Sequence, residues 1–461
     1  MSLLTVFQSS ICTGICMKQA VWEIRTNIFI NKNRKEMKKI KYLAMLLFVA
    51  LVSVAAVSCG DDNESGTDGG GGGGGTEAET LTPNEQKVKL EKVARKLVGK
   101  VDADQFSNIE DMAKGIEDTD DSAISDWADA CMDACLPDVK GDSVYSYLYA
   151  ASNFTGSFEL KDGKWTKSDE KVNYLQFKFN DNAGKNCVLK LEHSGKETTV
   201  HHESFDDEYY CYGWNGYYYT KYLMSKDKIS YSVPENIKVT LTQGGTTVAS
   251  TDIRTTLSVG SGDVDITRDG AEVTMTTTVN DYKFVLQKAV YSKGKSASVP
   301  SFVVTKGGEE LISLTANATG DLSDVDDPVL KTGSFEVKVL GGEARVVGNL
   351  TDGQTLKRCL DNAYDNDEYE EEFKKYINQA NSLIDVKLYL DNSDKYAALL
   401  RLQPFEEYYY SAYSSWDAKP VLVFGDGSSY SFDEYFDKNT FNTVINKVEN
   451  LIDDFIRMFD N

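Results

Sequence analysis

Two clusters of aromatic residues are the features of this sequence best suited to binding a ligand. The first lies between Tyr209 and Tyr222, and the second lies between Phe405 and Trp416. A tyrosine or tryptophan ring offers a flat apolar face with a polar tip, which suits stacking on a sugar ring or anchoring a partner protein. Alternate residues of a strand face opposite sides, so some of these rings belong to the core. The predicted ligand-binding residues are Tyr212, Trp214, Tyr217, Tyr219, Tyr408, Tyr410 and Trp416.

Paired carboxylates are a second source of chemistry, because glycoside hydrolysis requires two carboxyl groups on opposite sides of one bond. Asp206, Asp207 and Glu208 form one group, and Glu406 and Glu407 form another. With 72 acidic residues in the chain, adjacent acids also arise from composition alone, and a solvated acidic surface is the simpler interpretation. The sequence contains no Gly-x-Ser-x-Gly, no phosphate-binding glycine loop and no His-Glu-x-x-His motif. We therefore predict no catalytic residue, and an enzyme is the less favoured class.

The histidines give only a weak indication of a metal site. His193, His201 and His202 lie close together in sequence, with Glu203 as the nearest further ligand. Residues 194–196 (SGK) have the composition of a hairpin turn, which leaves His193 and His201 offset along the strand pair. A transition-metal site needs its ligands closer together. We expect solvated strand histidines, and we predict no metal and no cofactor.

The cysteines do not indicate a disulfide framework. An odd number of them follows Cys59, so they cannot all pair within the chain. Cys131 and Cys135 are four residues apart on a predicted helix, where a disulfide is geometrically awkward. We expect small buried residues, and the sequence leaves the disulfide status open for Cys131, Cys135, Cys187, Cys211 and Cys359.

A signal peptide is predicted at 37–58, not at the first methionine. Residues 37–41 (MKKIK) are basic, and the apolar run 42–57 is shorter than the roughly 20 residues that span a bilayer. The run ends in AVSC at 56–59, which resembles the bacterial lipobox, although Ala56 stands where that pattern usually has leucine. The resemblance implies that the thiol of Cys59 receives a diacylglycerol. An ordinary secretory signal that happens to end at a cysteine is the alternative. Residues 1–36 fit no part of such a signal, and we interpret them as an upstream extension.

Residues 59–80 are typical of a flexible tether. Acidic residues follow Cys59 closely, and a run of seven glycines occupies 69–75. A lysine-rich signal, a lipobox and an acidic stretch together resemble the surface-exported lipoproteins of Bacteroides-type bacteria. The resemblance implies an outer-membrane, cell-surface location, with the membrane as a partner through the N-terminal lipid. Two tripeptides at 121–123 (DSA) and 142–144 (DSV) also resemble the short O-glycosylation motif of that group, although a helix cap and a turn would explain them as well.

The charge of the chain excludes one class of partner. The sequence has 49 Lys and Arg against 72 Asp and Glu, which gives a net charge of −23. The segment 1–58 holds 8 basic and 2 acidic residues, so the chain from Cys59 onward carries −29. A surface this acidic repels phosphate backbones, and we therefore exclude nucleic acid as a partner.

The periodicity of apolar residues predicts helices first and then many strands. Residues 82–85 (TPNE) have the pattern of a capping box, and amphipathic segments continue from there. From about 143 the apolar residues recur at every second position. We predict a helical lead at 81–137 and an antiparallel β domain at 138–330 that curls or splits into two layers. The predicted hairpin turns are Gly244-Gly245, Asp269-Gly270, Gly307-Gly308 and Gly341-Gly342.

Residues 331–461 are predicted to form an α+β part. A helix is expected at 353–382, and a long helix at 431–459 begins at a second capping box, 431–434 (SFDE). The apolar stripe of this last helix most simply packs onto the sheet. Strands are expected at 384–391, 396–403 and 419–424. The predicted fold class is therefore α+β and predominantly antiparallel β, a half-barrel or sandwich with short N-terminal helices and a C-terminal helix on the sheet.

These features favour a lipid-anchored, non-enzymatic module that binds a glycan or a partner protein through its aromatic residues. Two alternatives stay open. A carboxylate-dependent enzyme acting on polysaccharide would place two carboxyl groups across a cleft. A half-barrel that carries an apolar molecule would leave its concave apolar face uncovered by the helix at 431–459. Ligand, partner and oligomeric state are not encoded in any motif of the sequence.

Overall fold

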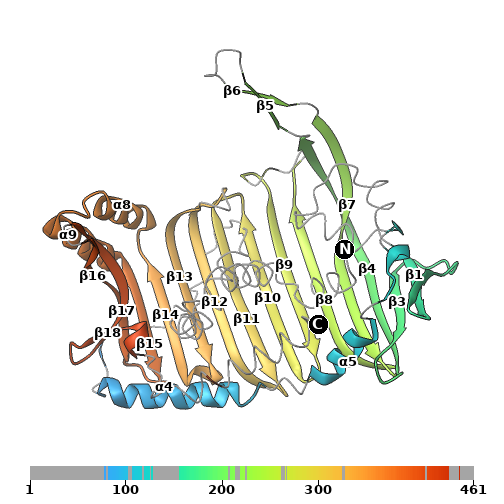
Figure 1. Cartoon of the computed structure of the whole chain (residues 1–461), viewed down its shortest axis with the longest axis horizontal. Helices are drawn as coiled ribbons and strands as arrows, with labels where there is room; N and C mark the ends of the chain where they lie inside the picture. Colours follow the sequence, from blue (N-terminus) through green and yellow to red (C-terminus); the bar gives the residue numbers. More distant parts are fainter. Residues whose placement is uncertain are drawn as a thin grey trace. The chain divides into compact units, whose positions relative to one another are not determined.

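The described residues form two compact units of mainly antiparallel β-sheet (Figure 1). One unit contains Ser107–Asn280, and the other contains the described residues up to Phe106 together with those from Asp281 onward. The predominantly antiparallel β-structure expected from the sequence is confirmed. The computed structural model describes residues 77–78, 81–101, 106–116, 119–124, 126–127, 155–205, 208–212, 219–223, 226–260, 265, 267–323, 328–410, 413–435 and 446, and the side chains of these except 202–231, 408–413 and 433.

The first unit is a sheet with the strand order β9-β8-β7-β4-β3-β1-β2. Its neighbours are antiparallel except for β1 and β3, which pair in parallel. Strands β5 and β6 form a separate two-stranded ribbon between β4 and β7 in the chain. The elements of this unit are α5 (Ser107–Ile116), β1 (Gly156–Lys161), β2 (Lys164–Lys167), β3 (Leu175–Asn180), β4 (Asn186–Phe205), β5 (Glu208–Tyr212), β6 (Tyr219–Leu223), β7 (Lys226–Gln243), β8 (Thr246–Ser258) and β9 (Gly270–Val279).

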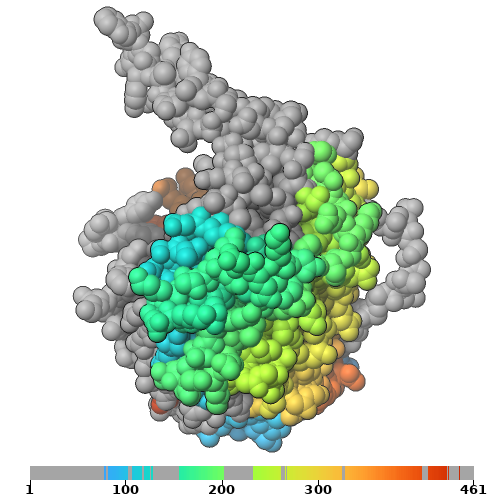
Figure 2. Space-filling view, turned by 90° about the vertical axis from the view of Figure 1, so that its right-hand side faces the viewer, coloured from blue at the N-terminus to red at the C-terminus, as the bar shows by residue number. Residues whose placement is uncertain are grey.

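Helix α5 packs tightly beside the end of β3. The backbone N–H of Asn182 donates to the carbonyl of Asp111 (2.9 Å). A Cβ atom at Gly115 would lie only 2.2 Å from the carbonyl oxygen of Asn180, so this glycine permits the close approach. The space-filling view shows the cyan residues at the start of this unit directly beside its green strands (Figure 2).

Strand β4 corrects the hairpin turn predicted at 194–196. The strand runs without interruption from Asn186 to Phe205 and pairs with β7 along its whole length. The register shifts between Ser194 and Glu197, so Gly195 (φ +90°) and Lys196 form a β-bulge. A glycine with positive φ serves a bulge as well as a turn, and the sequence pattern does not distinguish the two.

The predicted glycine turns have mixed outcomes. Gly244-Gly245 and Gly307-Gly308 join consecutive strands with positive φ at every position, as predicted. Gly341-Gly342 also joins two strands, within the short 3-10 turn η2 (Leu340–Gly342). The prediction for Asp269-Gly270 is wrong, because β8 ends at Ser258 and the connection to β9 is a longer loop.

The carboxylate of Asp269 organises that longer loop. It accepts hydrogen bonds from the backbone N–H groups of Gly260 and Asp265 (both 2.8 Å) and from the Arg268 guanidinium (2.8 and 2.9 Å). Burial by itself would raise the pKa of this carboxyl group. Its partners outweigh that effect, and the pKa of Asp269 lies below its usual value.

The second unit is an entirely antiparallel sheet in the order β18-β17-β16-β15-β14-β13-β12-β11-β10. Its elements are α4 (Pro83–Val98), β10 (Tyr282–Ser292), β11 (Ser296–Lys306), β12 (Glu309–Asp321), β13 (Val329–Val339), β14 (Ala344–Leu350), α8 (Gly353–Tyr364), α9 (Glu370–Leu383), β15 (Ile384–Leu390), β16 (Ala398–Tyr410), β17 (Tyr413–Phe424), β18 (Ser429–Ser431) and α10 (Phe432–Tyr435).

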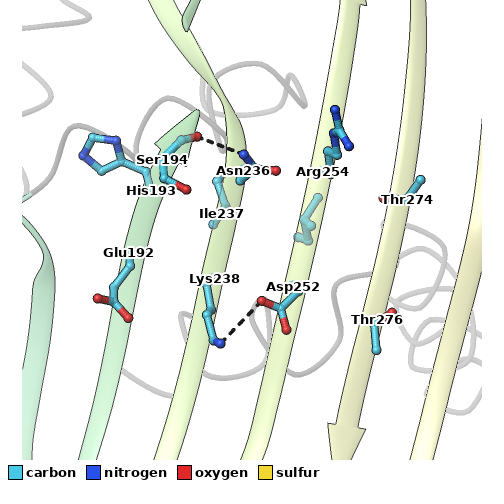
Figure 3. Close-up of a pocket in the computed structure, with 11 residues that line it drawn as sticks. Glu192, His193, Ser194, Asn236, Ile237, Lys238, Asp252, Arg254, Thr274 and Thr276 are labelled. Atoms are coloured by element: carbon cyan, nitrogen blue, oxygen red, sulfur yellow. Dashed lines mark hydrogen bonds and ion pairs between the residues drawn. The ribbon is translucent and has the colours of Figure 1, made fainter. Parts of the chain in front are cut away.

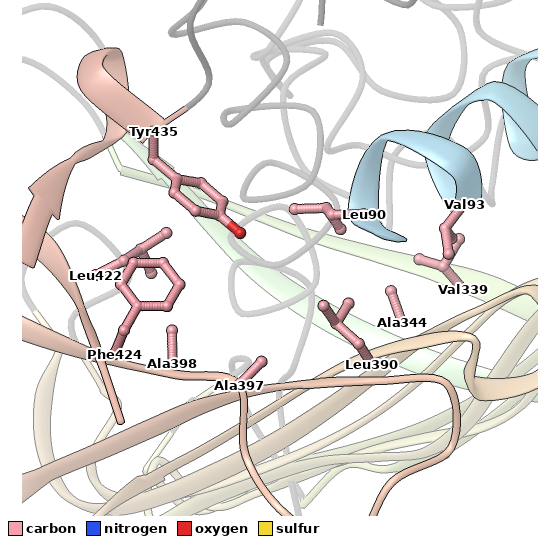
Figure 4. Close-up of a cluster of buried hydrophobic side chains, with 10 residues drawn as sticks. All are labelled: Leu90, Val93, Val339, Ala344, Leu390, Ala397, Ala398, Leu422, Phe424 and Tyr435. Carbon is pink, nitrogen blue, oxygen red and sulfur yellow. The ribbon is translucent and has the colours of Figure 1, made fainter. Parts of the chain in front are cut away.

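Helix α4 packs beside the ends of strands β13–β17 (Figure 1). The capping box forms as the sequence indicates: the Thr82 hydroxyl accepts from the N–H of Glu85, and the Glu85 carboxylate accepts from the N–H of Thr82. Leu90 and Val93 then meet side chains of the sheet and Tyr435 of α10 in one buried cluster (Figure 4). The sheet residues of this cluster are Val339, Ala344, Leu390, Ala398, Leu422 and Phe424, and Ala397 joins them from the loop before β16.

The chain just before α4 is fixed to the loop between β15 and β16. Ala78 forms a parallel bridge with Tyr396, and the carbonyl of Glu77 accepts the N–H of Tyr396 (3.1 Å). The Glu77 carboxylate also pairs with Lys395 (2.9 Å). Among the described residues, the contacts of this unit begin at Glu77, close to the end of the predicted tether.

The single helix predicted at 353–382 is two helices, α8 and α9. They are separated at 365–369, where Asp365, Asn366 and Asp367 favour a turn over a continued helix. The second predicted capping box forms, since Ser431 and Glu434 exchange hydrogen bonds at the start of α10. The rest of the helix predicted at 431–459 lies outside the described residues apart from Asn446. Within the described part of the chain, no helix combines the length and the apolar character needed to cross a membrane.

Replacing Asp269 with alanine is predicted to lower the free energy of unfolding by about 1–3 kcal/mol, because two backbone N–H groups lose a buried acceptor. The folded-state pKa is depressed, so the contribution of Asp269 is present above roughly pH 4 and is lost as the pH falls through that folded value. Urea denaturation between pH 3 and 7 measures both effects. Asp321→Ala, at an exposed carboxylate that contacts only Ser323 by hydrogen bonds, is the control. Equal losses in the two variants would contradict the prediction.

Candidate functional site

The predicted ligand-binding residues fall into two separate regions. Trp214 and Tyr217 lie outside the described residues. Tyr212 and Tyr219 are the last pair of the β5–β6 ribbon, and Tyr209 lies opposite Tyr222 in the same ribbon. The structure thus brings tyrosines of the first cluster together in cross-strand pairs. The second cluster lies on β16 and β17, where Tyr408, Tyr410 and Trp416 are placed.

Trp416 is the predicted ligand residue whose side chain is described, and it is half-buried. Its ring packs against a small core of Ala363, Phe373 and Ile377, which belong to α8 and α9. Its backbone N–H donates to the carbonyl of Asp367 in the connection between these helices (2.7 Å). Trp416 therefore links strand β17 to the helix pair and retains part of its surface for solvent.

Two exposed tyrosines that were not among the predicted residues flank the connection between α8 and α9, whose Asp367 carbonyl accepts the Trp416 N–H. Tyr364 is 49% exposed and Tyr369 is 63% exposed, unusually high values for large aromatic side chains. The Tyr364 hydroxyl donates to Asp417, the residue after Trp416 (3.0 Å). Burial of its hydroxyl, together with the negative Asp417, raises the pKa of Tyr364. We call Tyr364, Tyr369 and Trp416 the aromatic surface.

Charged side chains border the aromatic surface. The Lys374 ammonium lies 4.6 Å from the centroid of the Trp416 ring and also pairs with Glu370. Glu406 lies directly across the strand pair from Trp416 and accepts a hydrogen bond from Ser414 (2.6 Å). Flat rings with carboxylate and ammonium groups beside them can stack on a sugar ring and bond its hydroxyl groups.

A reciprocal hydrogen bond fixes the helix pair to the sheet. The Asn381 side-chain amide of α9 donates to the carbonyl of Leu402, and its oxygen accepts the N–H of Leu402 (both 2.8 Å). This pair of bonds satisfies both backbone groups of a β16 residue with one side chain. It sets the position of α9, and with it the aromatic surface, relative to β16 and β17.

Beside the aromatic surface, β17 has an edge that β18 covers only in part, and other groups satisfy the N–H groups along the remainder. Strand β18 pairs only with Val421–Val423. The N–H of Phe424 points toward β18, so by the two-residue period the N–H groups at 416, 418 and 420 point to the same edge. Trp416 donates to Asp367, Ala418 donates to the Asp417 carboxylate (2.7 Å), and Pro420 has no N–H. This edge therefore offers little to an incoming strand.

The predicted carboxylate groups do not form a catalytic pair in the described part of the chain. Glu406 and Glu407 are neighbours on β16, so they face opposite sides of the sheet. Asp206 and Asp207 lie outside the described residues, and of Glu208 only the backbone is described. Two carboxyl groups across one bond are therefore not assembled from Glu406 and Glu407.

The histidines lie along one strand instead of around a turn. His193 and His201 are eight residues apart on β4, which corresponds to more than 20 Å along an extended strand. The backbone of His202 and Glu203 continues the same strand. Within the described residues no three metal-ligating side chains come together.

Two cysteines are buried free thiols, in agreement with the expectation of small buried residues. Cys187 lies on β4. Burial and, to a smaller extent, the negative charge of Asp181 raise the pKa of its thiol to about 11. Cys359 is buried on α8. Cys131 and Cys135 lie outside the described residues, and of Cys211 only the backbone is described.

Of the two tripeptides that resemble a glycosylation motif, one is described. Ser122 is exposed, and its hydroxyl donates to the carboxylate of Asp120 (2.6 Å). The tripeptide at 142–144 lies outside the described residues.

Comparisons of the chain with protein-family models, with curated proteins and with solved structures found no match.

Replacing Asn381 with alanine is predicted to lower the free energy of unfolding by about 1–3 kcal/mol, since both backbone groups of Leu402 lose their partner. The change is also expected to loosen α9 and to increase amide hydrogen exchange in 370–383. Denaturation and hydrogen-exchange mass spectrometry measure the two effects. Asn378→Ala, at an exposed position of the same helix, is the matched control. Unchanged exchange in α9 of Asn381→Ala would show that this contact does not hold the helix.

Proposed function

We propose that this chain is a lipid-anchored protein of the outer membrane, exposed at the cell surface, that binds a glycan without catalysing a reaction. The observation that carries the binding function is the aromatic surface, where two exposed tyrosines of the helix pair accompany Trp416 of β17, against which that pair is packed. Exposed rings held by packed elements lose little conformational freedom on binding, which favours recognition. The lipid at Cys59 and the tether at 59–80 would keep this module at the membrane.

The polar groups around the rings support a glycan as the ligand. Asp417 and Glu406 provide carboxylate acceptors, and Lys374 provides an ammonium donor, within the same region as the rings. Hydrogen bonds between charged groups and neutral hydroxyls are stronger than those between neutral groups. A partner protein recognised through the same tyrosines is the competing outcome of the binding test, and the β5–β6 ribbon is a second tyrosine-rich region for either ligand.

We also propose the finer parts of the predicted fold. The helical lead would continue from α5 toward residue 137, and the helix that starts at Phe432 would extend to 459 across the apolar face. Leu90, Val93 and Tyr435 already form a buried cluster with residues at the ends of β13–β17. A covered face leaves less room for the apolar cargo that a half-barrel carrier would require.

Tyr369→Ala is predicted to weaken glycan binding about tenfold or more, because an exposed ring loses its stacking partner. The full-length chain on a glycan array, followed by calorimetric titration of the glycans it retains, measures the change. Val88→Ala, which removes a 64% exposed side chain from α4, is the control and should bind normally. Failure of the wild-type chain to retain any glycan would refute glycan binding. Equal affinity of Tyr369→Ala and wild type would remove the aromatic surface as the binding site.

Cys59→Ser is predicted to abolish lipid attachment and to release the chain from the membrane fraction. Radiolabelled palmitate incorporation and mass spectrometry of the N-terminal peptide measure the modification, and cell fractionation measures the location. Cys187→Ser is the control, since its thiol is buried in the sheet. A wild-type chain that carries no acyl group would contradict the proposed anchor.

A further inference from the structure

The backbone pairing between strands β7 and β8 of the first unit ends at a defined pair of residues. Their pairing runs from Gln243 and Thr246 only as far as Asn236 and Arg254. Beyond that point β7 continues with β4 as far as Lys226, while β8 continues with β9 as far as Ser258. The sheet therefore divides into two ribbons, and a fork opens at Asn236 and Arg254.

Side chains fix the strands at this fork. The Asn236 amide donates to the carbonyl of Ser194, directly before the β4 bulge (3.3 Å). The Glu235 carboxylate accepts from the N–H of Lys196 in the bulge (3.2 Å) and from the Arg254 guanidinium (2.9 Å). The bulge, β7 and β8 are thus joined by side chains where backbone pairing stops, which holds the fork in one shape. Bulges commonly re-aim strands next to binding sites.

A hollow of about 540 Å³ lies on the sheet face at the fork (Figure 3). The volume is large enough for a small molecule, and the hollow is open to solvent, with the Lys238, Asp252 and Arg254 side chains 53%, 56% and 63% exposed. The strand register arranges its lining in two rows that cross β4, β7, β8 and β9. The first row is Glu192, Lys238, Asp252 and Thr276, and the second row is Ser194, Asn236, Arg254 and Thr274.

The hollow, called the trough below, extends across four strands and over two same-face positions on each. Rows two residues apart on extended strands are separated by about 7 Å, and four neighbouring strands span about 14 Å. The side chains between the rows belong to the opposite face by alternation, and Ile237 among them is buried. Short side chains such as Ser194 and Thr274 leave space beside the longer Lys238 and Arg254.

The charges in the hollow are neutralised within the protein. The Lys238 ammonium lies 3.7 Å from the Asp252 carboxylate. The Glu192 carboxylate lies 2.7 Å from the Lys190 ammonium, and the Arg254 guanidinium lies 2.6 Å from the Glu235 carboxylate. An ionic ligand would have to break one of these pairs and would gain little net attraction. A neutral molecule rich in hydroxyl groups can accept from Lys238 and Arg254 and donate to Asp252 and Glu192 without breaking them.

We propose that this hollow is a second binding site of the chain and that it takes a short, uncharged saccharide lying across the strands between the two rows. The proposal rests on the glycan-binding function proposed above but concerns a different unit and different residues. It assigns recognition to hydroxyl hydrogen bonds at the fork, whereas the aromatic surface would contribute ring stacking.

Hydrogen-exchange mass spectrometry of the full-length chain with the neutral trisaccharides maltotriose, cellotriose and triacetylchitotriose tests the proposal. At least one of them should protect the amides of 236–238 and 252–254. Thr276→Trp, which fills the trough, and the paired change Lys238→Ala with Asp252→Ala should each weaken this binding at least tenfold. Thr246→Trp, at an exposed site near the turn of the same two strands, should change it less than twofold, and so should Tyr369→Ala.

Three outcomes would overturn the inference, and the first two leave the proposed function intact. Saccharide binding that Tyr369→Ala abolishes and Thr276→Trp leaves intact would keep the proposed function and remove the hollow. Equal protection of these amides by inorganic phosphate would identify an anion site instead. Binding of no saccharide by the wild-type chain, on the array or in exchange, would remove both proposals together.

Discussion

Every strand of an open sheet must find partners for its backbone N–H and C=O groups, and a strand without a neighbour needs another solution. In this protein the two regions proposed to bind ligands lie where such a neighbour is missing. At β17 the N–H groups of Trp416 and Ala418 are satisfied by the helix connection and by Asp417. At the fork, Glu235 and Asn236 join strands through their side chains. At both places, the groups that take over from the missing neighbouring strand also bring polar and aromatic side chains to the surface.

Much of the β-structure could be predicted from the sequence, because the two-residue period of apolar residues is a local signal. Leu175, Phe177 and Phe179 alternate with polar residues and form β3 as expected. Glycine is less informative. Gly244-Gly245 forms a turn, whereas Gly195 forms a bulge inside a strand of 20 residues. The difference depends on which residues of β7 lie opposite, and that information is not contained in the local sequence.

The candidate sites were predictable only in part, for a similar reason. Trp416 is recognisable because it lies in an aromatic-rich segment. Tyr364 and Tyr369 lie about 50 residues earlier in the chain, and only the packing of α8 and α9 on β16 brings them to the same region. The hollow at the fork draws on four strands and on ordinary polar residues. No sequence motif identifies these lining residues, because the register between neighbouring strands brings them together and their spacing along the chain does not.

The bridge between Ala78 and Tyr396 has a mechanical consequence. If the chain is held at Cys59, then among the described residues Glu77 and Ala78 are the first to bear a pull from the membrane, ahead of α4. One backbone hydrogen bond and one exposed ion pair resist it there, and both are individually weak. Under load these contacts of Glu77 and Ala78 would break before helix α4 separates from the sheet. The released residues would lengthen the tether while the unit stays folded.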